Sequence, residues 1–216
     1  MEQTVRSDST HRRLSRFRGW RLFAVAFVLA FAILLVIRSF FFEIFYIPSE
    51  SMEPTLQTGD RIAVERKMEN IERGDVVVFD GTGSFDPYQS TSPWVSHPLR
   101  TTGQWLGLRG SDTIYVKRVI GVGGDTVSCC SSGGKLTVNG EEIDEEYLPD
   151  NMLASDAKFT AEIPTNRIWV MGDNRENSLD SRSLIGSPGG GMIREEKVIG
   201  KAHWIIYPSS RWQEIH

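Results

Sequence analysis

The 216-residue sequence has few of the residues that build metal centres. It contains only two cysteines, which are adjacent, and its four histidines have no spacing typical of metal ligands. The histidines are His11, His97, His203 and His216. We therefore expect no zinc site, no other metal and no cofactor.

The sequence also lacks an excess of positive charge, internal repeats and a heptad pattern. Its 24 basic and 28 acidic residues give a formal net charge of −4, which argues against a general nucleic-acid-binding protein. With 40% hydrophobic and 24% charged residues, the composition is globular and excludes a disordered or collagen-like chain.

One segment has no polar side chain at all. Residues 22–37 read LFAVAFVLAFAILLVI, and three phenylalanines follow Arg38 and Ser39. Because a helix of roughly 20 residues spans a hydrocarbon core of ~30 Å, residues 22–42 are predicted to form a transmembrane anchor helix. A cleavable signal peptide is disfavoured because no small-residue cleavage site follows, and a buried core helix would rarely be so apolar.

The charges on either side of this segment predict its orientation. Residues 1–21 carry six arginines against two acids, whereas residues 39–216 carry 17 basic and 26 acidic residues. By the positive-inside rule, residues 1–21 form a basic cytoplasmic tail, and residues 43–216 form a domain outside the cytoplasmic membrane of a single-pass protein. The arginines would also suit a nucleic-acid-binding tail, but their position beside an apolar helix favours a topology signal.

After residue 42 the pattern becomes that of short strands rich in Val, Ile, Tyr and Trp, bounded by turn residues. No long amphipathic helix is visible. The dipeptide Asn139-Gly140 predicts a two-residue hairpin. The expected fold is mostly β with a large irregular loop content. The predicted strands are Arg61–Val64, Asp75–Phe79, Thr113–Ile120, Leu136–Val138, Arg167–Met171 and Lys197–Tyr207.

Two features of the outer part allow more than one interpretation. Residues 80–112 are predicted to be a long loop or insertion, in which Trp94 and Trp105 either touch lipid headgroups or pack onto the β domain. Cys129 and Cys130 lie where disulfides are permitted, but a vicinal disulfide is strained and uncommon. Free buried thiols are therefore favoured, an intermolecular bridge remains open, and no partner pattern supports a cysteine nucleophile.

Lys117 lies in the middle of an apolar strand. By alternation, Lys117 and Arg118 point to opposite faces, so that one cation is directed toward the buried side, or else the strand lies at an edge with both charges solvated. A lysine in apolar surroundings has a lowered pKa and can act as a general base when neutral.

A serine-containing turn supplies a matching nucleophile. Pro48 and Pro54 flank Ser49-Glu50-Ser51-Met52 and make this turn rigid. A serine needs a base, and no histidine pattern supplies one, whereas a Ser/Lys pair is a known alternative. A proline-serine turn without chemistry is the competing interpretation.

Together, five segments give the chain a resemblance to the bacterial type I signal peptidases, which are membrane-bound Ser/Lys endopeptidases. The resemblance covers the N-terminal anchor, PSESMEPT at 48–55, GDRIAVE at 59–65, YVKRVIGVGGD at 115–125 and MGDNRENSLDSR at 171–182. It implies a signal-peptidase-type β domain that removes signal peptides from exported preproteins.

The resemblance also implies roles for individual residues. Ser51 would be the nucleophile, and Lys117 would be the general base and later the acid. The backbone N–H of Ser51 and the hydroxyl of Ser49 would form the oxyanion hole, and Ser178 would hydrogen-bond the Lys117 amine. Ion pairs that brace the site would be formed by Asp173, Asp180, Arg118 and Arg182. Glu50 lies between the two serines, at a position where many members of the family have glycine or another small residue.

For the substrate, the resemblance implies shallow apolar pockets that prefer Ala at positions −1 and −3 of the cleavage site. The substrate would lie as an extended strand beside the strand of Lys117. The matching groove residues are Phe45, Ile47, Met52, Leu56, Ile62, Tyr115 and Val116. Because nine residues reach at most ~30 Å, Ser51 would lie near the membrane surface, so that lipid and the protein-export machinery are expected partners.

Two other functions compete with this one. Self-cleaving repressors share the Ser/Lys pair, but they carry a DNA-binding domain in place of an anchor. A single-pass β-rich binding protein with an inactive protease domain is the second alternative, and the presence of Ser51, Lys117 and Ser178 argues against it.

Overall fold

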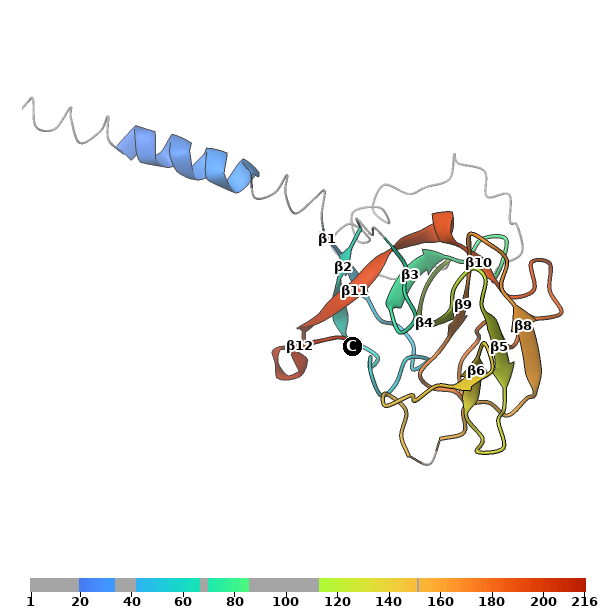
Figure 1. The fold of residues 1–216 in the computed structure, drawn as a ribbon. Coiled ribbons are helices and arrows are strands. Elements are labelled where there is room, and N and C mark those ends of the chain that lie inside the picture. The colour runs from blue at the N-terminus through green and yellow to red at the C-terminus, as the bar shows by residue number, and fades with distance from the viewer. Residues whose placement is uncertain (1–19, 34–41, 67–69, 86–112, 151) are drawn as a thin grey trace, which may run out of the picture. The chain divides into compact units, whose positions relative to one another are not determined.

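The computed structural model describes residues 20–33, 42–66, 70–85, 113–150 and 152–216 (Figure 1). The chain divides into two compact units, Met1–Phe41 and Phe42–His216.

The described part of the first unit is a helix over residues 20–33, with all its side chains exposed. In the described parts of the chain, no helix combines the length and the apolar composition required of a membrane span. Most of the predicted basic tail and residues 34–41 of the predicted anchor lie outside the described residues.

In the second unit, the described strands form two antiparallel sheets. The larger sheet has the order β1 (Phe42–Tyr46), β2 (Arg61–Glu65), β11 (Val198–Tyr207), β3 (Val76–Asp80), β4 (Ile114–Gly121), β9 (Arg167–Met171) and β10 (Ile193–Arg194), and β12 (Gln213–Glu214) pairs with β11. The smaller sheet has the order β7 (Glu141–Glu142), β6 (Leu136–Val138), β5 (Thr126–Cys129) and β8 (Phe159–Glu162). Two short 3-10 helices, η1 (Glu195–Lys197) and η2 (Ser209–Arg211), flank β11.

The mostly β fold class is thus confirmed, and each of the six predicted strands overlaps an observed one. The hairpin between β6 and β7 is confirmed as well, because Val138 pairs with Glu141 across the turn. Asn139 and Gly140 have φ angles of 56° and 86°, as a two-residue turn of this kind requires.

Strand β1 was not predicted. Phe42, with which the expected anchor ends, is the first residue of β1, and Phe45 pairs with Ile62 of β2. The phenylalanine-rich run hides this boundary because its apolar residues continue the pattern of the preceding segment. Strands β5, β8, β10 and β12 are short, at two to four residues each, and were also not predicted.

Strand β11 lies inside the larger sheet, between β2 and β3. It pairs with β2 on one side and with β3 on the other, and both pairings are antiparallel (Figure 1). Residues Val76–Phe79 of β3 are all buried, as expected for a strand covered on both faces. Strand β3 in turn pairs with β4, so that β4 lies in a rigid part of the sheet.

The first residues of the predicted loop at 80–112, up to residue 85, belong to the described part of the chain. Asp80 ends β3, and Phe85 packs at 5.3 Å from the Phe79 ring and 5.2 Å from the Tyr115 ring. Residues 86–112, including Trp94 and Trp105, lie outside the described residues.

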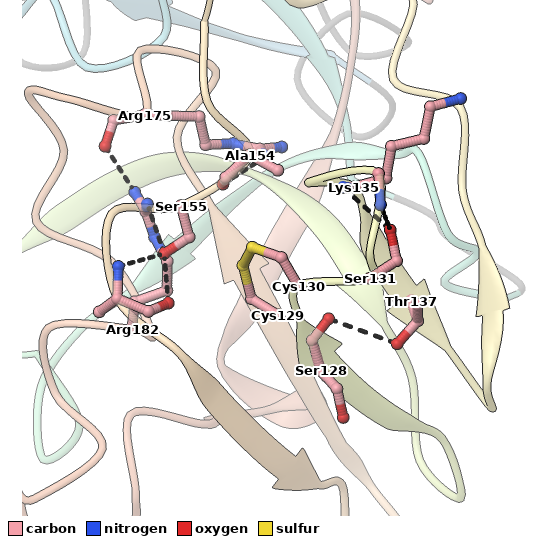
Figure 2. Close-up of a disulfide and its surroundings, with 12 residues drawn as sticks. Ser128, Cys129, Cys130, Ser131, Lys135, Thr137, Ala154, Ser155, Arg175 and Arg182 are labelled. Atoms are coloured by element: carbon pink, nitrogen blue, oxygen red, sulfur yellow. Dashed lines mark hydrogen bonds between the residues drawn. A yellow bond between two sulfur atoms is a disulfide. The ribbon is translucent and has the colours of Figure 1, made fainter.

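The two cysteines differ from the expectation of free thiols. The structure joins Cys129 and Cys130 in a disulfide at the end of β5, beside Ala154 and Ser155 (Figure 2). Cys129 belongs to a buried apolar cluster, and Cys130 packs against the same cluster.

Candidate active site

Ser51 lies in the turn that connects β1 to β2. Ile47 closes this connection through hydrogen bonds with Asp60 and Gly59, both 2.9 Å long. Met52 and Leu56 are buried in the core, and the Leu56 N–H donates to the Met52 carbonyl. Burial of these neighbours holds the turn in place and leaves the Ser51 side chain partly exposed.

Lys117 lies on β4 opposite Val77 and is only 3% exposed. Arg118 is 1% exposed, so both cations are buried, and the alternative of an edge strand with solvated charges is wrong. The reason is that β4 lies between β3 and β9. Burial lowers the pKa of Lys117 to about 8, against the opposing effect of the nearby Asp180 and Asp173 carboxylates.

The structure brings the predicted nucleophile and base together. Lys117 Nζ is hydrogen-bonded to Ser51 Oγ at 2.6 Å, and Ser49 Oγ lies 3.3 Å from Ser51 Oγ. When the lysine is neutral, the serine hydroxyl donates this bond, which is the arrangement needed for proton transfer from Oγ to Nζ. The three side chains therefore form a hydroxyl–amine site with a second hydroxyl beside it.

Arg118 and Asp173 form the expected ion pair. Arg118 donates to Asp173 through Nε at 2.9 Å and through Nη2 at 2.8 Å, and both side chains are buried. Thr55, four residues after Ser51, donates to the same carboxylate at 2.6 Å. The pair therefore connects β4, the segment after β9 and the serine turn.

Arg182 and Asp180 form the second expected ion pair. Arg182 Nη2 donates to Asp180 at 2.8 Å, and the same carboxylate accepts from the Gly172 N–H at 3.1 Å. Arg182 also donates to the Arg175 carbonyl at 2.9 Å and to Ser155 Oγ at 3.4 Å (Figure 2). These bonds join the two ends of the segment 172–182.

Ser178 does not make its expected bond. Its Oγ is buried and has no hydrogen-bond partner among the described residues, so the expected bond to Lys117 is not formed. The Lys117 amine is instead bonded to Ser51 Oγ.

A cavity of about 330 Å³ opens beside Ser51 and Lys117. Five of the seven predicted groove residues line it, together with Tyr46, Pro48 and Ile114. The five are Phe45, Ile47, Met52, Tyr115 and Val116. Leu56 and Ile62 do not line it, because both are fully buried in the apolar core cluster that also contains Ile47 and Met52.

Several residues that support the site were not predicted. The Tyr147 ring lies 3.9 Å from the Arg118 guanidinium, and the Tyr147 hydroxyl donates to Glu145 at 2.6 Å. Glu145 also forms a buried ion pair with Arg175. Tyr147 and Glu145 lie in an acidic segment without regular secondary structure. The only sequence signal for their role is an aromatic residue that follows several acidic ones.

The chain was compared with known proteins. It matches the family model described as signal peptidase, peptidase S26, over residues 20–207. It is 38% identical to a signal peptidase I of Mycobacterium tuberculosis over 89% of this chain and 74% of that protein. It is 31% identical to a signal peptidase I of Bacillus licheniformis over 93% of each. Among solved structures, a signal peptidase I of Enterococcus faecalis aligns with a TM-score of 0.40 and 21% identity, covering 62% of this chain and 98% of that one.

The family model and the sequence relatives extend over nearly all the chain, including the segments of Ser51, Lys117 and the two buried ion pairs. The chain therefore belongs to the signal peptidase family, peptidase S26, and is a serine endopeptidase of the signal peptidase I type.

Proposed function

We propose that Ser51 and Lys117 are the catalytic pair with which this enzyme removes N-terminal signal peptides from exported preproteins after Ala-x-Ala sites. The observation that carries this proposal is the 2.6 Å hydrogen bond between Lys117 Nζ and Ser51 Oγ at the mouth of an apolar cavity. A buried lysine with a pKa of about 8 is largely neutral in mildly alkaline solution and can accept the serine proton.

Each step of acyl transfer then has a group to perform it. Ser51 Oγ attacks the carbonyl carbon of the scissile bond while its proton moves to Lys117 Nζ. The N–H of Ser51 and the hydroxyl of Ser49 stabilise the oxyanion, and such donors contribute roughly 3 kcal/mol each. The Lys117 ammonium returns the proton to the leaving amine, and the neutral lysine then activates the water that hydrolyses the acyl-enzyme.

The cavity suits a small apolar residue before the cleaved bond. Its walls are Phe45, Ile47 and Met52 on the serine side and Ile114–Lys117 of β4 on the other. Pairing of β4 with β9 begins at Arg118, so the cavity is lined by the part of β4 that precedes this pairing. An extended preprotein segment beside Ile114–Lys117 would direct alternate side chains into the cavity.

The membrane context is also a proposal. The apolar run at 22–37, the arginines before it and the short distance to Ser51 support a single anchor with the N-terminus in the cytoplasm. The catalytic unit would then act at the outer surface of the bacterial cytoplasmic membrane, close to lipid and to the export machinery. Protease added outside wall-stripped cells should digest residues 60–216, and complete protection would contradict this orientation.

The catalytic assignment is tested with detergent-solubilised full-length enzyme and a preprotein that carries an Ala-x-Ala site. Ser51→Ala and Lys117→Met should each abolish cleavage, with thermal unfolding showing that both variants are folded. Lys135→Met is a matched control, because Lys135 is exposed and pairs with Asp144 on the smaller sheet. Cleavage by either active-site variant at the wild-type rate would refute the assignment.

A further inference from the structure

The peptide unit between Glu50 and Ser51 is held by two hydrogen bonds. The Glu50 carbonyl accepts from the Glu53 N–H at 3.0 Å, which closes the turn, and from the Asn174 side-chain amide at 3.2 Å. A carbonyl oxygen has two lone pairs, and both are used here.

The next peptide unit is held by the same asparagine. The backbone N–H of Asn174 donates to the Ser51 carbonyl at 3.1 Å. The peptide planes before and after Ser51 are therefore both fixed by Asn174.

Planarity makes this arrangement relevant to catalysis. In a trans peptide the C=O of one residue and the N–H of the next point in opposite directions within one rigid plane. An anchor on the Glu50 carbonyl therefore also sets the direction of the Ser51 N–H, which is the proposed backbone donor to the oxyanion.

Gly172 allows the segment that contains Asn174 to approach the turn that contains Ser51 this closely. A Cβ built on Gly172 would overlap both the Ser51 carbonyl oxygen and Ser178 Oγ. Asp173, the residue before Asn174, accepts hydrogen bonds from Arg118 and Thr55. These bonds hold the backbone next to Asn174 in place.

We propose that Asn174 is a positioning residue for the oxyanion hole, which aims the Ser51 N–H by holding the Glu50 carbonyl. The proposal rests on the proposed role of Ser51 as the nucleophile. Asn174 itself touches neither substrate nor the reacting atoms, and its contribution is made only when the oxyanion forms.

The first test uses steady-state kinetics of the full-length enzyme. Asn174→Ala removes the amide, and Asn174→Asp replaces its donor by an oxygen that repels the Glu50 carbonyl, while both keep the backbone N–H. We expect kcat to fall about 10- to 100-fold with KM changed less than about twofold, since loss of a whole oxyanion donor costs 10²–10³ in kcat. Asn177→Asp is the control, because it adds the same charge at an exposed site of the same loop and should leave kcat unchanged.

The second test separates positioning from general damage to the site. A peptide aldehyde ending in alanine accepts Ser51 Oγ at its carbonyl carbon, and its oxygen then occupies the oxyanion hole. The corresponding peptide alcohol fills the same cavity but forms no such adduct. In the Asn174 variants the aldehyde should bind about 10- to 100-fold more weakly, in step with kcat, while the Kd of the alcohol stays the same.

Equal weakening of aldehyde and alcohol, or an unchanged aldehyde Kd, would overturn the positioning role. Failure of the proposed function has a different signature, because Ser51→Ala would then bind the aldehyde as tightly as the wild type does. Thermal unfolding of each variant ensures that only folded protein is compared.

Discussion

At the residue scale, the burial of Lys117, the proposed general base, carries a cost in stability. Its side chain is 3% exposed, and desolvation penalises the ammonium form that free lysine prefers at neutral pH. The carboxylates of Asp173 and Asp180 partly offset this penalty through their charge. The ion pairs with Arg118 and Arg182 hold those carboxylates in place.

The lowered pKa of Lys117 predicts the pH profile. Because the base must be neutral, kcat/KM should rise with pH up to about 8, roughly tenfold per unit below it, and then level off. Initial rates of peptide cleavage from pH 6 to 10 would measure it. His203→Gln should leave the midpoint in place, since the His203 side chain contacts Glu65 on the sheet and does not line the cavity. A profile flat across this range would contradict a lysine base.

Gly172 provides a second prediction at this scale. Gly172→Ala introduces a methyl group that overlaps the Ser51 carbonyl and Ser178, so cleavage should fall by at least about 100-fold because the nucleophile is displaced. Gly186→Ala is the matched control, since a Cβ there meets nothing within 4 Å and the residue is exposed. Similar rates for both variants would show that the close approach at Gly172 is dispensable.

At the scale of elements, the irregular segment between β7 and β8 acts as a strap under the active site. We define this strap as residues 143–150 and 152–158. It contacts three arginines, because Tyr147 stacks on Arg118 and Glu145 pairs with Arg175. In addition, Ser155 accepts a hydrogen bond from Arg182, which Figure 2 shows. The disulfide of Cys129 and Cys130 lies beside Ala154 of this strap, in the same apolar cluster.

The buried pair of Glu145 and Arg175 predicts a large effect on stability. Glu145→Ala leaves the Arg175 guanidinium buried without its carboxylate, which costs about 3–5 kcal/mol in the free energy of unfolding. Chemical denaturation would measure this change. Glu146→Ala, which removes an exposed carboxylate next to it, should change stability by less than about 0.5 kcal/mol. Equal effects would mean that the pair does not anchor the strap.

The elements that sequence reasoning found and missed differ in physical character. Strands such as β6 and β9 have alternating or continuous apolar residues between turn residues, so their bounds were predicted to the residue. Strand β1 was missed because its apolar residues extend a longer apolar run. The strap has no periodicity, and its contacts join residues far apart in the chain, such as Tyr147 and Arg118. Leu56 and Ile62 were assigned to the groove through the family resemblance, which does not distinguish a residue that lines a cavity from one in the core behind it.

At the scale of the whole molecule, the division into two units predicts that the second unit works alone. A fragment of residues 42–216 should fold and cleave a short soluble peptide with an Ala-x-Ala site, since β1 and every residue that lines the cavity are retained. A fragment of residues 47–216 lacks β1 and the Phe45 wall, so it should not cleave the peptide. Activity of the shorter fragment equal to that of the longer one would show that β1 is not part of the site.

The position of β11 between β2 and β3 has a consequence for the rate of folding. Ser51 lies between β1 and β2, and Lys117 lies on β4 next to β3, while residues 198–207 join these two halves of the sheet. The halves therefore cannot be aligned until a strand that follows both of them in the chain has inserted between them. Pairings over such long sequence separations are slow, because loop closure precedes the gain in contact energy. We therefore expect Ser51 and Lys117, the proposed nucleophile and base, to meet late in folding, so that an incompletely folded chain should have no proteolytic activity.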